Sequence, residues 1–225
     1  SAASDVYKRQ KPWCVSAPTP SAVACALVLA TLRPVLQPQQ LQVTAMLSIS
    51  TLGRSGVQEL ARQTAELLNG RPLESKAVDR QIAFNLLAQV GEVDDHGHAQ
   101  LEKRLVAEIQ QLLSLPGLPV AATCALVPVF FGDSLALGVY ADSAIDISTV
   151  LQLLEVAPGI ELVEVGDYPT AVGDAVGQDQ VYVGRVRRGV SDPRQLNLWI
   201  ASDNVRKGAA LNAVQIAELL IKHYL

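Results

Sequence analysis

The stretch from residue 196 to residue 220 constrains the fold of this chain more than any other. Apolar residues dominate positions 196–201 and predict a strand, and Ser202, Asp203 and Asn204 form a polar turn signal. Apolar residues at helical spacing then predict a long helix over 208–224. The chain therefore closes with a strand, a turn and a helix.

The remaining pattern mixes strands and helices without an internal repeat. The segment 120–129 is almost wholly apolar, so we expect it to be buried on both faces. A helix is expected to begin at Thr19, Pro20 or Ser21 and to run to about Leu32, because proline favours a first helical turn. Other strands are predicted at 13–16, 41–50, 135–140, 160–165 and 181–186, and other helices at 53–68, 101–113 and 147–156. The sequence predicts an α+β fold with a large mixed β-sheet and helices packed on one face.

Composition excludes several classes of function. The formal net charge of −4 lacks the dense Lys/Arg face that nucleic acid requires. Arg185, Arg187 and Arg188 form the only tight basic group, which we interpret as a solvated strand end rather than a phosphate site. No apolar run reaches the roughly 18–20 residues of a membrane span, and no signal peptide is visible. We expect no membrane association and a cytoplasmic location.

Cysteine and histidine give no metal or disulfide pattern. The three cysteines are widely spaced, and Cys25 and Cys124 lie in apolar runs typical of buried small hydrophobes. His96 and His98 stand beside two acidic residues but lack a second ligand pair at zinc-type spacing. We interpret this segment as an exposed loop, and no metal site is predicted.

Several short motifs together resemble one enzyme family. They are Phe84-Asn85 followed by Gln89, Thr123-Cys124 leading to Val127-Pro128-Val129 and Ser134, Tyr168-Pro169, Ala175-Val176-Gly177, Val183-Gly184-Arg185-Val186-Arg187, and the closing segment 196–220. The chain resembles the aspartate-semialdehyde dehydrogenase family over nearly all residues after Trp13. The resemblance implies a dinucleotide-binding domain followed by a catalytic and dimerisation domain. It also implies an NADP-dependent interconversion of aspartyl phosphate and aspartate semialdehyde through a cysteine thiolate at a helix N-terminus.

The positions that match the catalytic residues of that family hold other residues here. The nucleophile's turn corresponds to residues 17–22, which places Pro20 at the cysteine position. Leu52 stands where the family has a glutamine that orients the acyl group. Leu126 replaces the arginine that grips the substrate carboxylate, and Asp133 replaces the histidine that acts as acid and base. Cys14 and Cys25 are not placed to replace the nucleophile.

Some binding positions of the family remain. Glu102 and Arg104 resemble its Glu-x-Lys pair, which helps to hold the substrate phosphate. Asn212 matches an asparagine that contacts the cofactor, although a purely structural role is an equal alternative. NADP is the cofactor that the resemblance implies, but we expect this chain not to bind it, because a Gly-rich dinucleotide turn is missing.

These observations predict four segments. Residues 5–10 can be encoded by a common transposase adapter used in sequencing libraries, so residues 1–10 are expected to be a non-native leader. Residues 11–35 would be the remnant of a truncated Rossmann-like dinucleotide-binding domain, 36–207 a catalytic-like dimerisation domain, and 208–225 a C-terminal helix.

The function predicted from the sequence is a catalytically inactive member of the family that forms a homodimer. Two alternatives remain open. One is an oxidoreductase with altered chemistry, for which Asp133 is the sole acid–base candidate. The other is an interaction module that pairs with the true enzyme or with another partner.

Overall fold

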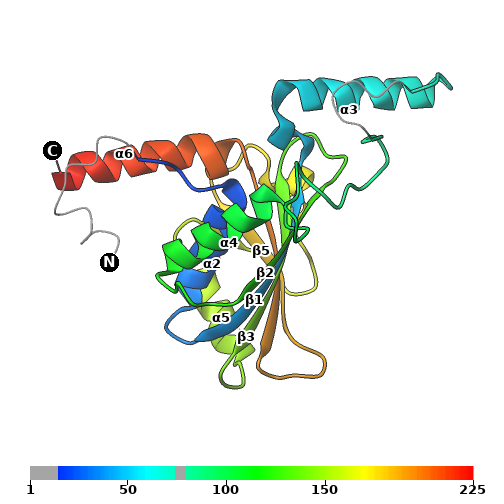
Figure 1. The fold of residues 1–225 in the computed structure, drawn as a ribbon. Helices are drawn as coiled ribbons and strands as arrows, with labels where there is room; N and C mark the ends of the chain where they lie inside the picture. Colours follow the sequence, from blue (N-terminus) through cyan, green and yellow to red (C-terminus); the bar gives the residue numbers. More distant parts are fainter. Residues whose placement is uncertain (1–14, 74–79, 225) are drawn as a thin grey trace.

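A computed structural model describes residues 15–73 and 80–224, with side chains to residue 222 (Figure 1). The described residues build a six-stranded mixed sheet of order β2-β1-β3-β6-β5-β4. Its strands are β1 (Pro38–Leu47), β2 (Val120–Leu126), β3 (Asp133–Ala141), β4 (Ile160–Leu162), β5 (Val181–Arg188) and β6 (Gln195–Ser202). The pairs β1/β2 and β4/β5 are parallel, and the other neighbours are antiparallel. The predicted α+β class with a mixed sheet is confirmed.

Three helices cover one face of this sheet: α2 (Pro20–Leu32), α4 (Gln100–Leu113) and α5 (Ile147–Glu155) (Figure 1). Alternate residues of β1 face them, so Leu41, Val43 and Ala45 are buried while Gln42 is exposed. Helix α2 buries Ala22, Cys25, Val28, Leu29 and Leu32. The core therefore lies between this helical layer and the sheet, as the sequence predicts.

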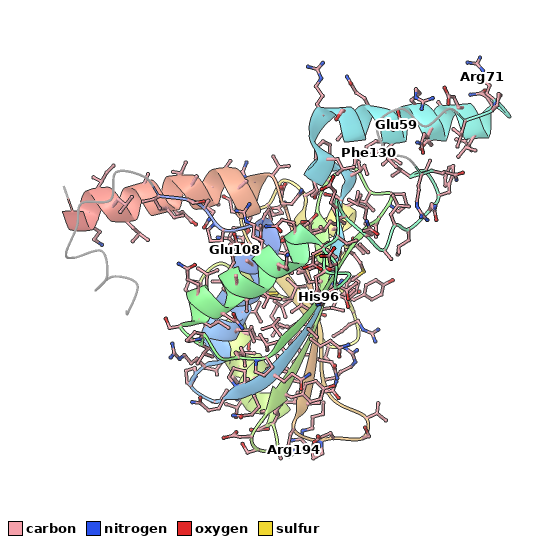
Figure 2. All side chains as sticks on the ribbon, in the orientation of Figure 1. Glu59, Arg71, His96, Glu108, Phe130 and Arg194 are labelled. Atoms are coloured by element: carbon pink, nitrogen blue, oxygen red, sulfur yellow. The ribbon has the colours of Figure 1, made fainter. Side chains whose placement is uncertain are left out.

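Two further helices project away from that layer. Helix α3 (Gly53–Leu68) follows a 3-10 turn, η1 (Ile49–Leu52), and Arg71 lies at its far end (Figures 1 and 2). Helix α6 (Leu211–Tyr224) follows the short π-helical segment η3 (Arg206–Ala210) and extends away on the other side (Figure 1). The apolar positions Leu68, Val214, Leu219 and Ile221 on these two helices are exposed.

Helices α2, α4 and α5 leave the opposite face of the sheet uncovered. Its residues are mostly small or polar, with Met46, Tyr140 and Trp199 half-buried. The segment that contains η2 (Ala171–Ala175) crosses part of this face, where the Trp199 indole N–H donates to the Pro169 carbonyl at 3.0 Å. The face is thus less apolar than the strand sequences alone indicate.

Most differences from the sequence prediction lie at element ends. The strand predicted over 120–129 stops at Leu126, because Pro128 has no N–H and the Val129 N–H bonds back to the Val127 carbonyl at 2.8 Å. The strand predicted over 41–50 begins at Pro38 and ends at Leu47, where η1 takes over. The strand predicted over 160–165 ends earlier, at Leu162 of β4, and Gly166 with φ of 103° lies in the loop that follows.

The domain boundaries remain predictions. Residues 1–10 lie outside the described residues, as do Trp13 and Cys14 of the strand predicted over 13–16, whose last two residues lie in no strand. Within the described part of 11–35, helix α2 shares one hydrophobic cluster with the sheet. No gap in packing therefore separates it from the rest at residue 35.

Candidate functional site

A cavity of about 340 Å³ opens where the N-terminus of α2 meets the ends of β1, β2 and β3. Thr19, Pro20 and Ser21 line one side of it, and Ser50 and Thr51 of η1 line another. Asn204 and Val205 of the turn after β6 and Ala209 of η3 line a third side. Apolar walls come from Leu47, Leu101 and Leu105.

Two of the four positions that the sequence comparison predicts to have lost catalytic residues line this cavity. Pro20 is the first residue of α2, and Asp133 is the first residue of β3, and both line the space. Leu126 is 3% exposed and packs in the core, with its backbone paired to Leu87. Leu52 is partly buried against the same core. Leu52 and Leu126 are therefore not among the described residues that line the cavity.

Ser48, the residue that follows β1, holds the Asp133 side chain by two hydrogen bonds. The Asp133 Oδ1 accepts hydrogen bonds from the Ser48 N–H at 2.9 Å and from the Ser48 hydroxyl at 3.0 Å. Burial raises the pKa of Asp133 to about 6, against the lowering effect of the Ser48 hydrogen bonds, and the nearby charge of Asp203 adds to the rise. The network continues through Ser50 to Asn204, whose Nδ2 donates to the Ser50 hydroxyl at 2.9 Å.

Cys124 also lines the cavity, which the sequence interpretation as a buried small hydrophobe did not foresee. Burial, together with the negative charges of Glu102 and Asp133, raises the pKa of its thiol to about 12. The side chain is a protonated thiol at neutral pH and a poor nucleophile. The alternation of β2 could have revealed its direction, because Cys124 shares a face with Leu126.

Glu102 and Arg104 are not brought together as a binding pair. Glu102 bonds the N–H of Ala99 at 3.0 Å and the N–H of Cys124 at 3.0 Å, so it joins the start of α4 to β2. Arg104 is half-exposed and pairs at 2.7 Å with Glu108 on its own helix. Glu108, labelled in Figure 2, in turn accepts hydrogen bonds from the N–H and hydroxyl of Thr19, at 2.7 and 2.6 Å.

Asn212 lies at the start of α6, and its Nδ2 is buried without a hydrogen-bond partner among the described residues. It is not part of the cavity lining. An unfilled buried amide donor is a feature that a bound polar ligand can satisfy. An Nδ2 without a partner is consistent with a cofactor contact and also with a purely structural role for Asn212.

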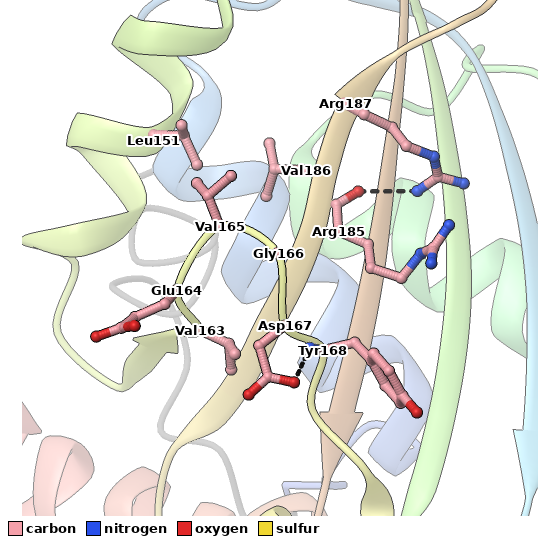
Figure 3. A pocket seen from close by; sticks show the side chains of 10 residues that line it. All are labelled: Leu151, Val163, Glu164, Val165, Gly166, Asp167, Tyr168, Arg185, Val186 and Arg187. Atoms are coloured by element: carbon pink, nitrogen blue, oxygen red, sulfur yellow. Dashed lines mark hydrogen bonds between the residues drawn. The ribbon is translucent and has the colours of Figure 1, made fainter.

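A second, smaller cavity of about 180 Å³ lies beside the basic group of β5 (Figure 3). Arg185 has φ of 51° at a bulge in β5, and its carbonyl accepts a hydrogen bond from Arg187 at 2.8 Å. Arg188 instead donates to the Ile145 carbonyl at 2.6 Å. Glu164 and Asp167 stand on the same cavity, so the arginines are not gathered around one anion-binding position.

Across the described parts of the chain, no group of three or more His, Cys, Asp or Glu side chains could hold a metal ion. Asp94 fixes the loop that contains His96 and His98, because its Oδ1 accepts hydrogen bonds from their backbone N–H groups at 3.0 and 2.9 Å. Among the helices of residues 15–73 and 80–224, none has both the length and the hydrophobicity to cross a membrane.

Comparison with known proteins agrees with this geometry. Residues 29–207 match the family model described as semialdehyde dehydrogenase, dimerisation domain. The chain is 60% identical over 215 residues to a USG-1 protein homolog of Azotobacter vinelandii, covering 96% of this chain and 64% of that protein. It is 44% identical over 200 residues to aspartate-semialdehyde dehydrogenase 2 of Vibrio cholerae, covering 88% and 59%.

Solved structures give the same result. A probable aspartate-semialdehyde dehydrogenase from Pseudomonas aeruginosa superposes with a TM-score of 0.96 at 56% identity, covering 99% of this chain and 67% of that one. The chain thus spans about two thirds of the length of these relatives. It belongs to the aspartate-semialdehyde dehydrogenase family and contains that family's dimerisation domain.

Proposed function

We propose that this chain does not carry out the NADP-dependent interconversion of aspartyl phosphate and aspartate semialdehyde, and that it acts as a dimerisation and interaction module. The observation that carries the proposal is Pro20 at the first position of α2, on the cavity. A relative from Vibrio cholerae has been solved complexed with ASA. In the family, the thiolate that attacks the acyl group stands at the position of Pro20.

The cavity offers no substitute for that thiolate. Proline has neither a nucleophilic atom nor a backbone N–H that could stabilise an anion. Among the described residues that line the cavity, Cys124 is the one with a thiol, and its raised pKa of about 12 keeps that thiol protonated. An acyl transfer that depends on a thiolate therefore has no starting group here.

Substrate binding is also compromised. Leu126 cannot pair with a carboxylate, and Asp133 is the sole charged residue of the described cavity lining. Aspartyl phosphate carries a carboxylate and a phosphate, which Asp133 would repel. The losses at four positions act on separate steps, so restoring one of them leaves the others unmet.

An oxidoreductase with altered chemistry is the second candidate. It is favoured by one observation, the buried Asp133 with a pKa near 6, which suits a general acid or base close to neutral pH. Such an enzyme would need a substrate that requires neither a thiolate nor an anion-binding arginine.

NADP belongs to the family, and a neighbouring structure from Candida albicans contains it. In this chain, the unfilled Nδ2 of Asn212 is the feature that fits a polar cofactor group, and bound NADP would supply hydride acceptance. We propose that this contact alone does not hold the dinucleotide tightly, because the sequence has no Gly-rich phosphate turn.

The proposal is tested with a chimaera in which the part of the Vibrio cholerae relative that precedes the matched region is joined to this chain. Phosphate-dependent formation of NADPH from aspartate semialdehyde should be absent, and Pro20→Cys alone should not restore it. A matched chimaera that also carries Leu52→Gln, Leu126→Arg and Asp133→His should recover turnover, which shows that the joined protein folds. Activity of the unsubstituted chimaera within about tenfold of the Vibrio enzyme would overturn the proposal.

We also propose that the chain forms a homodimer through the sheet face opposite α2. On that face, small residues surround the half-buried Met46, Tyr140 and Trp199. Among the described elements, no helix covers it. A two-fold dimer would bring the face against itself. Sedimentation equilibrium at micromolar concentration should give a dimer. Ala136→Arg on the open face should give a monomer, whereas Gln152→Arg on α5 should leave the mass unchanged.

The cytoplasm is the location that we propose. Cys25 and Cys124 are free thiols buried in the core, and reducing compartments maintain such unpaired thiols.

A further inference from the structure

The cavity at the N-terminus of α2 has the size and lining of a ligand site rather than a packing defect. Its volume of about 340 Å³ falls in the usual range for small-molecule pockets. Leu47, Leu101 and Leu105 give it apolar walls, and the hydroxyls of Thr19 and Ser50 are set among them. An apolar chamber with a few placed polar groups selects ligands by the charge of those groups.

The decisive polar group is the second oxygen of Asp133. Ser48 donates twice to Oδ1, whereas Oδ2 has no hydrogen-bond partner within the described residues. The side chain is 2% exposed and lines the cavity. Because Asp133 lines the cavity and its Oδ2 has no protein donor among the described residues, a hydrogen-bond donor on a bound molecule can satisfy this oxygen.

The neighbouring charges that act on Asp133 and Cys124 in the cavity are acidic. Asp203 raises the pKa of Asp133 by its charge, and Glu102 does the same for Cys124. The positive end of the α2 dipole could favour an anion, but Glu108 already accepts both the N–H and the hydroxyl of Thr19 there. No Lys, Arg or His is among the described lining residues.

We propose that this cavity binds a small organic cation, in which an ammonium group on an apolar body donates to Asp133 Oδ2, and that it rejects carboxylates and phosphates. The ammonium supplies the hydrogen-bond donors that Oδ2 lacks, and the apolar body replaces water against the leucine walls. The inference rests on the proposed function in one respect, since both depend on the absence of a basic side chain from the described cavity lining.

Three ring compounds of nearly equal shape serve as probes for this chain: benzylammonium, benzyl alcohol and benzoate. Titration is followed by amide chemical shifts in NMR spectra. Benzylammonium should shift the amides of Ser48, Ser50 and Asp133 and bind at least about tenfold more tightly than benzyl alcohol. Benzoate should shift none of these amides.

Two variants assign the effect to Asp133. Asp133→Asn preserves the shape and the acceptor for Ser48, and it should bring the affinity for benzylammonium down to that for benzyl alcohol. Asp95→Asn removes the same charge from an exposed loop position and should leave the affinity unchanged. The wild-type comparison of the three probes stands by itself even where a variant fails to fold.

The proposal is overturned where benzoate or benzyl alcohol binds as tightly as benzylammonium, or where folded Asp133→Asn binds benzylammonium as the wild type does. These outcomes are separate from the test of the proposed function. Selective binding of the cation together with dehydrogenase turnover in the chimaera would sink the proposed function alone. Equal binding of the three probes without turnover would sink the cation site alone.

Discussion

The backbone of Gly208 packs directly against the ring of Pro20. A Cβ atom built at Gly208 would lie 2.9 Å from both Cα and Cγ of Pro20, and closer still to its Cβ. The segment that follows β6 is thereby seated on the first turn of α2, next to the cavity. The close approach depends on the absence of a side chain at residue 208.

Gly208→Ala should therefore destabilise the fold. The added methyl group has to push the start of α2 away from η3, and such overpacking typically costs about 1–3 kcal/mol. Urea unfolding followed by circular dichroism measures the change. Gly117→Ala is the matched control, because a Cβ there would meet no atom within 4 Å. A Gly208→Ala protein as stable as this control would contradict the packing described.

Gln63→Met should weaken the attachment of residues 82–83 to α3. The Gln63 side chain is fully buried, and its Oε1 accepts from the N–H groups of Ile82 at 2.7 Å and Ala83 at 3.2 Å. Methionine fills the space but leaves both N–H donors unpaired, which lowers the free energy of unfolding by about 1–3 kcal/mol. Hydrogen exchange of these two amides should accelerate. Gln58→Met, at an exposed position of the same helix, should leave their exchange rates unchanged.

Asp133 should make the stability depend on pH in an unusual direction. Its pKa in the folded protein, about 6, lies above the ordinary value of 3.8 because of burial. The stabilising contribution is therefore complete below about pH 4 and is lost as the pH rises through about 6. Relative to Asp133→Asn, the wild-type free energy of unfolding should fall by about 3 kcal/mol over that interval.

The measurement is a set of urea unfolding curves for both proteins between about pH 4 and pH 7, with Asp95→Asn as the surface control. A difference between wild type and Asp133→Asn that stays constant with pH, or that grows in favour of the wild type, is incompatible with a carboxyl held as the structure shows.

Cys25 and Cys124 should resist alkylation. Burial raises the pKa of each thiol to about 12, so very little thiolate is present near pH 8. In a Cys14→Ser background, both residues should react with iodoacetamide at least about a hundredfold more slowly than free glutathione. Peptide mass spectrometry follows each site, and the unfolded protein provides the fast limit. Rapid labelling of Cys124 in the folded chain would reopen the question of a nucleophile in the cavity.

Local rules in the sequence are sufficient for several elements. The spacing of apolar residues predicts the helix at 53–68, and the structure has α3 at Gly53–Leu68. Proline in a first helical turn predicts the start of α2, which is Pro20. Strand ends are less accessible to such rules, because β1 ends at Leu47 where η1 begins, although apolar residues continue along the chain.

The degenerate positions Pro20 and Asp133 can be identified from neighbouring residues along the chain, because each has a local anchor in the motif. Their meeting in one cavity cannot, since they are 113 residues apart in the numbering and come together through the sheet register and the packing of α2. The alternation of β2 gives the face on which Cys124 lies, and its place on the cavity depends on how α2 and β3 pack around the end of β2. Local sequence thus predicts which residues replace the catalytic set. Tertiary packing decided which of them share a space and which carboxylate oxygen lacks a protein donor there among the described residues, because burial and charge are properties of the assembled neighbourhood.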